Sequence, residues 1–331
     1  MNDDPRLQQL RDWLAGETGM ARPQVRPVAG DASFRRYFRL CRGEESFIVM
    51  DAPLDKEDCR PFVAIARAMG ARGLNVPRVL AADFSRGFLL LSDLGDVQYA
   101  QVLTAQRADE LYGDALAALL RLQADGLPAE PVLPDYGREL LWAEMALFKD
   151  WLLERHCGMR LQPDDEDQWR DGCERLVEAA LAQPRVWVHR DYHSRNLMYT
   201  QRANPGILDF QDAVCGPITY DLVSLLRDCY IAWPEQQVMQ WQEDYRRRLL
   251  ACGLLDREVD AGTFARWCDW MAMQRHLKAA GIFARLYHRD GKAAYLADIP
   301  RTVGYIVQAS RRYGELEFLH RLASRVLERL P

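Results

Sequence analysis

The chain has 331 residues, 49% of them hydrophobic, and is long enough to bury a sizeable core in one two-lobed unit or in two domains. Its formal net charge of −5 argues against a general nucleic-acid binder, which would carry a surplus of basic residues. No apolar run approaches the roughly 18 residues that a membrane-spanning helix needs, and the acidic N-terminus does not resemble a targeting sequence. The eight cysteines form no Cys-x-x-Cys pair, which predicts reduced, mostly buried thiols in a cytoplasmic protein.

The first part of the chain predicts an antiparallel sheet accompanied by two helices. Residues 6–16 have the apolar periodicity of an amphipathic helix. Two strands over 35–41 and 46–51 are separated by a short polar turn, which is a hairpin signal. Asp58 can cap a second helix that carries a proline in its first turn, and residues 88–95 form an apolar strand ending in a polar break. The predicted order of elements after the first helix is β-β-β-α-β-β.

From about residue 101 the pattern becomes helical, because apolar residues recur at helical spacing. The predicted helices cover 138–156, 166–182, the stretch that begins at Tyr220, and several pieces of 235–331. Two short β-type runs, at 186–189 and 206–209, interrupt them. Since there are no repeats or long linkers, we predict an α+β fold with two lobes. An antiparallel β-sheet lobe occupies residues 1–95, and a mainly helical lobe occupies residues 96–331.

The chemistry is concentrated in residues 189–196 and in the aspartate that ends the next short strand. The first stretch reads His-x-Asp-x-x-x-x-Asn. Phosphoryl transfer needs a carboxylate that holds the acceptor hydroxyl and oxygen ligands for magnesium near the nucleotide phosphates. Asp191 suits the first role, and Asn196 and Asp209 suit the second, because Mg²⁺ prefers hard oxygen ligands. The joint spacing favours phosphotransfer over the structural alternative, an ordinary hairpin with a polar turn.

At these positions the chain resembles known phosphotransferases. His189, Asp191, Asn196 and Asp209 are similar to the catalytic loop and the metal-binding aspartate of protein kinases. His193 turns the loop into His-x-Asp-x-His-x-x-Asn, the form seen in aminoglycoside phosphotransferases and choline kinases.

Three further segments, 30–38, 49–53 and 91–95, narrow the resemblance. They are similar to the branch of anomeric kinases that acts on N-acetylmuramate and N-acetylglucosamine in peptidoglycan recycling. The resemblance implies a two-lobed protein-kinase-like fold and an enzyme that uses ATP and Mg²⁺ to phosphorylate the C1 hydroxyl of these sugars. It also implies a cytoplasmic monomer whose partners are small molecules, with no nucleic acid and no membrane.

The nucleotide site implied by the resemblance lies in the sheet lobe. Gly30 and Ser33 would place backbone N–H groups and a hydroxyl over the phosphates. Ser92, Asp93 and Leu94 would form a hinge whose backbone contacts the adenine.

The strand that should supply a phosphate-binding lysine carries Met50 instead. Arg35, Arg36 or Lys56 could replace the lysine. Because side chains alternate between the two faces of a strand, at most one of Arg35 and Arg36 points toward the nucleotide. Met50 is also the one feature that favours a non-catalytic nucleotide-binding regulator over an enzyme.

Several residues of the helical lobe are expected to position the catalytic loop. His189 is predicted to brace the loop. Asp221 can cap the helix that it begins, and the resemblance implies that it also braces the loop; the two roles are compatible. His193 stands where protein kinases often have a lysine that faces the transferred phosphate. Arg195 is therefore a candidate to neutralise charge at the catalytic centre.

Charged residues of the helical lobe are candidates to contact the acceptor together with Asp191 and His193. They are Glu144, Asp212, Arg227, Arg275 and Lys278. For all but Asp212, which follows the metal motif closely, a solvated helix face is the alternative. A kinase of a cationic molecule, such as an aminoglycoside or choline, would need a concentrated acidic pocket or an aromatic cage. The mixed charges favour a neutral or anionic sugar instead.

Overall fold

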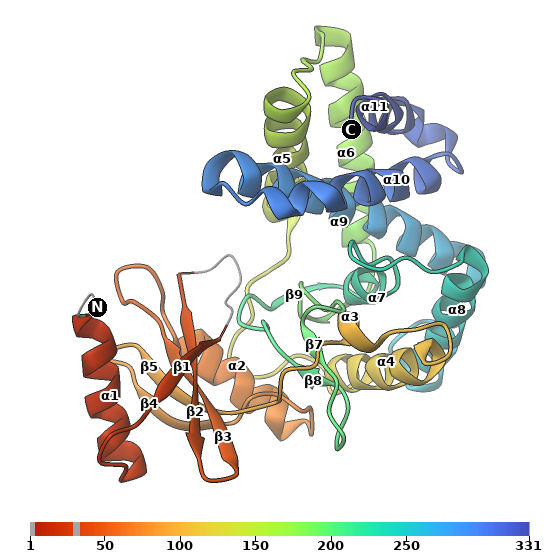
Figure 1. Ribbon diagram of the computed structural model, residues 1–331. Helices are drawn as coiled ribbons and strands as arrows, with labels where there is room; N and C mark the ends of the chain where they lie inside the picture. The colour runs from red at the N-terminus through yellow and green to blue at the C-terminus, as the bar shows by residue number, and fades with distance from the viewer. Residues whose placement is uncertain (1–3, 29–33, 331) are drawn as a thin grey trace. The chain divides into compact units, whose positions relative to one another are not determined.

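The computed structural model describes residues 4–28 and 34–330. Within them the chain divides into two compact units (Figure 1). The first, the sheet unit, comprises the described part of Met1–Val97 together with Ala129–Pro131 and Met198–Gln211. The second, the helical unit, contains the rest of the chain. The sequence analysis did not anticipate that later segments return to the first unit.

The sheet unit is built on a five-stranded antiparallel sheet with the order β1-β2-β3-β5-β4. The strands are β1 (Val25–Val28), β2 (Arg36–Arg42), β3 (Glu45–Asp51), β4 (Val79–Asp83) and β5 (Phe88–Ser92), and the helices are α1 (Pro5–Thr18) and α2 (Arg60–Ala71). The predicted hairpin is confirmed, because β2 and β3 pair from their turn at Arg42↔Glu45 to Arg36↔Asp51. The observed order of elements after α1 is the predicted β-β-β-α-β-β.

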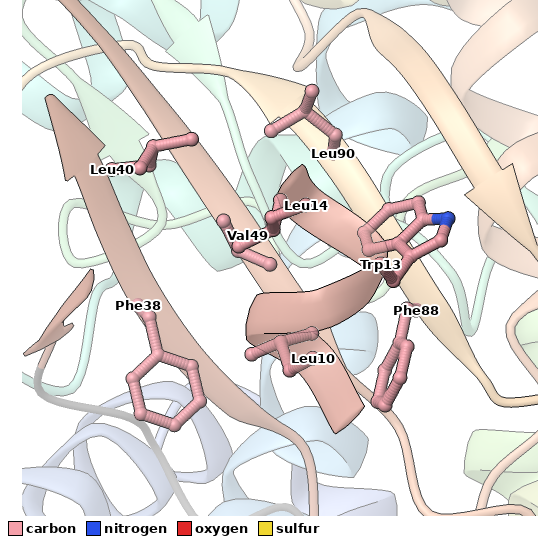
Figure 2. Close-up of a cluster of buried hydrophobic side chains, with 8 residues drawn as sticks. All are labelled: Leu10, Trp13, Leu14, Phe38, Leu40, Val49, Phe88 and Leu90. Carbon is pink, nitrogen blue, oxygen red and sulfur yellow. The ribbon is translucent and has the colours of Figure 1, made fainter. Parts of the chain in front are cut away.

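Helix α1 covers one face of this sheet. Asp4 caps its start by accepting two backbone N–H groups, and Gly19 ends it in the left-handed conformation. Leu10, Trp13 and Leu14 of α1 are buried against apolar side chains from alternate positions of β2, β3 and β5 (Figure 2). Burial of each large apolar side chain stabilises the folded state by roughly 1.5–3 kcal/mol, so α1 and this face of the sheet form one core.

The helical unit begins with α3 and is mostly helical, as predicted. Its helices are α3 (Tyr99–Val102), α4 (Ala108–Ala124), α5 (Arg138–Leu147), η1 (Phe148–His156), α6 (Pro163–Leu181), α7 (Tyr220–Leu226), α8 (Glu235–Ala251), α9 (Ala261–Asp290), η2 (Ala293–Asp298), α10 (Ile299–Ser310), η3 (Gly314–Leu316) and α11 (Glu317–Leu327). Strands β6 (Arg185–Val188) and β9 (Val214–Pro217) pair in it, and β7 (Leu197–Met198) pairs with β8 (Gly206–Ile207). None of the helices in the described ranges combines the length and the apolar character needed to cross a membrane.

Helix α9 is buried along most of its length and packs against α5, η1, α6, α7 and α10. The single helix predicted over 138–156 is continuous in the structure, but its second half, η1, is a π-helix. Gly281 of α9 lies at the junction of the two halves. A Cβ atom at this position would overlap the backbone of Leu147 and Phe148. The approach of α9 to the start of η1 therefore requires glycine.

We expect Gly281→Ala to lower the free energy of unfolding by roughly 1–3 kcal/mol, because backbone atoms cannot move aside for the added methyl group. Thermal and urea denaturation would measure the change. Gly304 of α10 provides the matched control, because a Cβ atom there meets nothing within 4 Å. Gly304→Ala should leave stability unchanged or raise it by roughly 0.5–1 kcal/mol through helix propensity. Equal effects of the two substitutions would contradict the packing argument.

Candidate active site

Strand β6 leads into the loop of residues 189–196, whose first residues are held by a buried carboxylate. Asp221, in the first turn of α7, accepts the backbone N–H of His189 at 2.6 Å and that of Arg190 at 3.0 Å. Arg190 has a φ of 78°, a conformation that a non-glycine residue keeps only where its surroundings hold it. The ring Nδ1 of His189 accepts the N–H of Asp191 at 3.2 Å. Asp221 thus binds the loop, and no side chain caps α7.

The Asp221 carboxyl is unusually basic for an aspartate. Burial raises its pKa to about 7, although the two N–H groups that it accepts act in the opposite direction. The ionised form accepts both bonds best, so the bracing of the loop is strongest at neutral pH and above.

A second buried carboxylate, missed by the sequence analysis, holds the other end of the loop. Asp228, beyond the end of α7, accepts the N–H of Ser194 at 2.9 Å and the N–H of Tyr230 at 2.9 Å. The ring of Tyr230 lies 5.3 Å from that of His193, and the Arg195 guanidinium carbon lies 3.5 Å from its centroid. No spacing rule connects Asp228 with the loop, so only the tertiary structure identifies it.

Asp191 is surrounded by positive charge within the helical unit. Burial would raise the pKa of its carboxyl, but the charges of Lys278, His193 and Arg275 outweigh burial and hold the pKa below its usual value. The Asn196 side-chain amide donates to the Asp191 carbonyl at 3.0 Å and closes the loop on itself. The loop therefore presents an ionised carboxylate, which is the form that can accept a proton from a hydroxyl.

Glu144 lies at the centre of a buried network. Its Oε1 is bound by Arg190 at 2.5 Å and by Lys278 at 3.0 Å. Its Oε2 accepts from Gln274 at 3.2 Å and from the Tyr136 hydroxyl. Burial would raise the pKa of Glu144, but the two cations keep it below its usual value. Because both oxygens are bound within the unit, Glu144 is suited to position Arg190 and Lys278, whereas the sequence analysis expected a substrate contact.

Arg275 differs from its neighbouring cations. It is only 5% exposed, yet no carboxylate in the described part of the chain forms an ion pair with it. Its Nε has no hydrogen-bond partner, and one Nη lies 3.7 Å from the Cys229 sulfur. Lys278, one helical turn later in α9, is bound by Glu144 and by the Tyr220 hydroxyl, both at 3.0 Å.

The other predicted contacts of the helical unit have separate surroundings. Arg227 is bound by Glu235, with Nη–Oε distances of 2.7 and 2.8 Å. Arg195 lies 3.7 Å from Asp298 as well as over the ring described above. Asp212 is exposed. Arg227 is thus bound by Glu235. Of the candidates, His193, Arg275 and Lys278 are those whose charges act on Asp191.

Asp209 belongs to the segment that returns to the sheet unit. It has a φ of 62°, and its Oδ1 accepts the Gln211 side chain at 2.7 Å. The next residue, Phe210, packs on Phe62 of α2 with ring centroids 4.8 Å apart. This contact anchors the segment and helps to hold the left-handed conformation of Asp209.

The predicted hinge residues follow β5. The Ser92 hydroxyl accepts the N–H of Arg78 at 2.8 Å. The Asp93 carboxylate accepts from Arg39 at 2.6 Å and from the N–H of Gly95 at 2.8 Å. Because the side chain of Asp93 is bound within the sheet unit, a nucleotide contact at this position would involve backbone groups.

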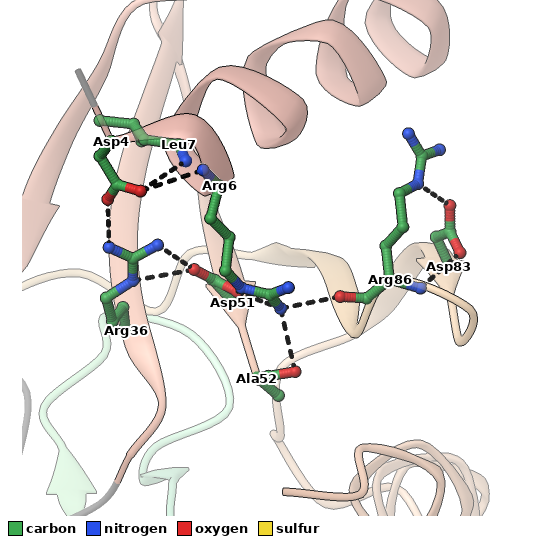
Figure 3. Close-up of polar contacts among 8 residues, drawn as sticks. All are labelled: Asp4, Arg6, Leu7, Arg36, Asp51, Ala52, Asp83 and Arg86. Carbon is green, nitrogen blue, oxygen red and sulfur yellow. Dashed lines mark hydrogen bonds and ion pairs between the residues drawn. The ribbon is translucent and has the colours of Figure 1, made fainter. Parts of the chain in front are cut away.

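Arg35 and Arg36 have different partners, as the alternation of a strand predicts. Arg36 is bound by Asp51, with an Nε–Oδ2 distance of 2.8 Å, and by Asp4 at the start of α1 (Figure 3). Arg35 pairs with Glu57, with an Nη–Oε distance of 2.8 Å.

Comparison with known proteins shows the family and the fold of the chain. The phosphotransferase enzyme family matches residues 24–263. The N-acetylmuramate/N-acetylglucosamine kinase of Pseudomonas aeruginosa is 46% identical to the chain, covering 97% of both, and that of Pseudomonas putida is 43% identical, covering 96% of both. Among solved structures, choline kinase from Cryptosporidium parvum has a TM-score of 0.64 at 11% identity, covering 97% of this chain and 99% of its own. The GDP complex of wild-type aminoglycoside 2'-phosphotransferase-IIIa has a TM-score of 0.62 at 14% identity, covering 98% and 99%. The structural likeness confirms the predicted protein-kinase-like fold.

Proposed function

The chain belongs to the phosphotransferase enzyme family, and we propose that it is a kinase that transfers a phosphoryl group from ATP to the C1 hydroxyl of N-acetylmuramate and N-acetylglucosamine. The observation that carries the proposal is the likeness, over nearly the whole chain, to kinases named for these two sugars. The products are sugar 1-phosphates that feed peptidoglycan recycling, and the enzyme acts as a cytoplasmic monomer.

The surroundings of Asp191 support this function over its rivals. The charges of Lys278, Arg275 and Arg190 all act on Asp191, and such a site repels a cationic acceptor such as choline or an aminoglycoside. A non-catalytic regulator has no need of a partly buried aspartate kept ionised by several cations. The site favours a neutral or anionic sugar that is phosphorylated.

Asp191 acts as the base in the proposed reaction. Its carboxylate accepts the proton of the C1 hydroxyl while the C1 oxygen bonds to the γ-phosphorus and ADP leaves. The transition state is loose and the proton moves late, so a carboxylate with a low pKa is sufficient. An anomeric hydroxyl, which is more acidic than an ordinary alcohol, suits such a base. His189, Asp221 and Asp228 hold the loop, and Arg195 is assigned to neutralise charge on the transferred group.

Magnesium is assigned to Asn196 and Asp209. Each offers a hard oxygen, and Mg²⁺ is usually held by one or two protein groups together with substrate phosphates. When bound, the ion neutralises charge that develops on the phosphates. Asp209 suits this role because its carboxylate is held at one oxygen by Gln211.

ATP is assigned to the sheet unit. The backbone groups of Ser92, Asp93 and Leu94 contact the adenine in this proposal, which fits the bound side chain of Asp93. Gly30 and Ser33 are assigned to the phosphates on sequence grounds, and both lie outside the described residues.

Arg275 is assigned to the lactyl carboxylate of N-acetylmuramate. Asp191 and Asp228 act on Arg275 through their charge, but neither forms an ion pair with it. A buried guanidinium without an ion-paired carboxylate is costly, and an anionic substrate group would reduce that cost. Lys278 is the weaker candidate, because Glu144 already binds it. Together with Asp191 and His193, Arg275 forms the acceptor side of the site.

We expect Arg275→Ala to lower kcat/KM for N-acetylmuramate by roughly 10- to 100-fold, the range for a lost charge-assisted hydrogen bond. The value for N-acetylglucosamine, which lacks the lactyl group, should change much less. Arg301→Ala serves as the matched control, because Arg301 is half-exposed and its partners among the described residues are the Cys229 carbonyl and Asp298. Equal losses on both sugars would refute the carboxylate pairing and leave the kinase assignment standing.

The reaction itself is tested by phosphorus NMR of the products formed with Mg-ATP and a panel of small sugars. We expect sugar 1-phosphates from the two amino sugars. A 6-phosphate would contradict the anomeric assignment, and turnover of choline or an aminoglycoside in place of the sugars would contradict the acceptor assignment.

A further inference from the structure

The two faces of the sheet present different side chains near Met50. The side chains of Phe38, Leu40 and Val49 point to the α1 face (Figure 2). Because side chains alternate along a strand, Tyr37 and Met50 point to the opposite face. The two residues are direct partners in the register of β2 and β3. The position that lacks a lysine is therefore next to Tyr37.

Arg36 cannot replace the lysine, because it is bound on the α1 face. Its Nε and one Nη lie 2.8 and 2.5 Å from Oδ2 of Asp51, and it also binds Asp4 (Figure 3). Asp51 is fully buried and is further bound by Arg6 at 2.6 Å. Arg36 thus ties α1 to the sheet.

Lys56 is also poorly suited. Its side chain is 53% exposed, and its nearest ionic partner is Asp55 at 3.7 Å. A solvated lysine of this kind contributes little to holding a phosphate in one place.

Arg35 immediately precedes β2, and continuing the alternation of the strand would place it on the same side as Tyr37 and Met50. It precedes Tyr37 by two residues, and its charge acts to lower the pKa of the Tyr37 hydroxyl. It pairs with Glu57 at 2.8 Å, and the side chains of the pair are only 10% and 16% exposed. Burial raises the pKa of Tyr37 to about 12, and the charge of Asp209 contributes in the same direction. Arg35, Glu57, Tyr37 and Asp209 therefore share one neighbourhood within the sheet unit.

We propose that the Arg35–Glu57 ion pair binds the phosphates of the nucleotide, in place of the lysine that Met50 replaces. The inference rests on the proposed function. A guanidinium has five N–H donors, so pairing with Glu57 is compatible with further bonds to phosphate oxygens. Glu57 compensates the buried charge and fixes the direction of the guanidinium before the nucleotide binds. The cation thus comes from the residue before β2, and its carboxylate comes from the segment before α2.

The test is calorimetric titration of the full-length protein with ATP, ADP and adenosine. Arg35→Ala is expected to weaken ATP and ADP binding by roughly 10- to 100-fold, the range for a lost charge-assisted hydrogen bond. Adenosine has no phosphates, so its affinity should stay within about twofold. Arg42→Ala removes an exposed arginine of the same strand, which pairs with Glu45 at 2.8 Å, and should change none of the three affinities.

Three results would overturn the proposal: unchanged ATP affinity in folded Arg35→Ala, an equal loss for adenosine, or an equal loss in Arg36→Ala. A thermal melt establishes folding, and Arg35→Gln, which keeps a polar group beside Glu57, replaces the alanine variant if that variant is unfolded. A wild-type protein that binds no ATP would instead refute the proposed function. The two failures are therefore distinguishable.

Discussion

Asp191→Ala is expected to lower kcat by roughly 10²–10⁴-fold, the usual contribution of a positioned general base. The physical reason is that its carboxylate aligns the C1 hydroxyl and accepts its proton, which no neighbouring cation can do. Steady-state kinetics with both sugars would measure the loss. ATP binding should remain close to that of the wild type, because Asp191 belongs to the helical unit.

Two variants make the Asp191 experiment specific. Asp191→Asn keeps the size of the side chain and should be nearly as slow, because an amide cannot act as the base. Asp125→Asn changes an exposed aspartate just beyond α4 and should have no effect. A near-normal kcat in a folded Asp191→Ala protein would contradict the assignment of Asp191 as the base.

Asp209→Asn is expected to lower activity on the order of 10²-fold at ordinary Mg²⁺ concentrations, because it removes the charge that holds the ion against the phosphates. Raising Mg²⁺ should restore part of the lost activity. Asn196→Ala should shift the Mg²⁺ dependence in the same direction by a smaller amount, because an amide oxygen is a weaker ligand. Activity would be measured against Mg²⁺ at saturating sugar.

Gln211→Ala is the control for Asp209. It removes the 2.7 Å hydrogen bond to the carboxylate but leaves the charge in place, so the Mg²⁺ dependence should move much less. If both Asp209→Asn and Asn196→Ala keep the wild-type Mg²⁺ dependence, the ligands lie elsewhere.

The sheet could be predicted because its signals are local. Alternating apolar residues in β2 and β3 with a polar turn between them determine a hairpin wherever the rest of the chain lies. The loop from His189 to Asn196 could be predicted for the same reason, since a few residues at fixed spacing set the geometry of a tight loop. A returning segment such as Met198–Gln211 has no local signal, because its place depends on contacts such as Phe210 with Phe62.

The partners of the charged residues could not be predicted, because they depend on contacts between residues that are far apart in the sequence. From the sequence, Glu144, Arg227 and Lys278 were equivalent charges on helices. In the structure all three are buried. A buried charge must find partners, so it is the identity of the partners that distinguishes them. Glu144 binds Arg190 and Lys278, and Arg227 binds Glu235, whereas no carboxylate in the described part of the chain forms an ion pair with Arg275.

By itself the sequence determined the order of strands and helices, the candidate catalytic loop and the expectation that Arg35 and Arg36 point to opposite sides. These features follow from the spacing of residues along the backbone, which does not depend on tertiary contacts. Only the tertiary structure decided that Arg36 binds α1, that Arg35 pairs with Glu57, and that Asp228 holds Ser194. Those choices depend on which buried groups meet across the fold, and the energy of an ion pair or hydrogen bond depends on the burial of both partners.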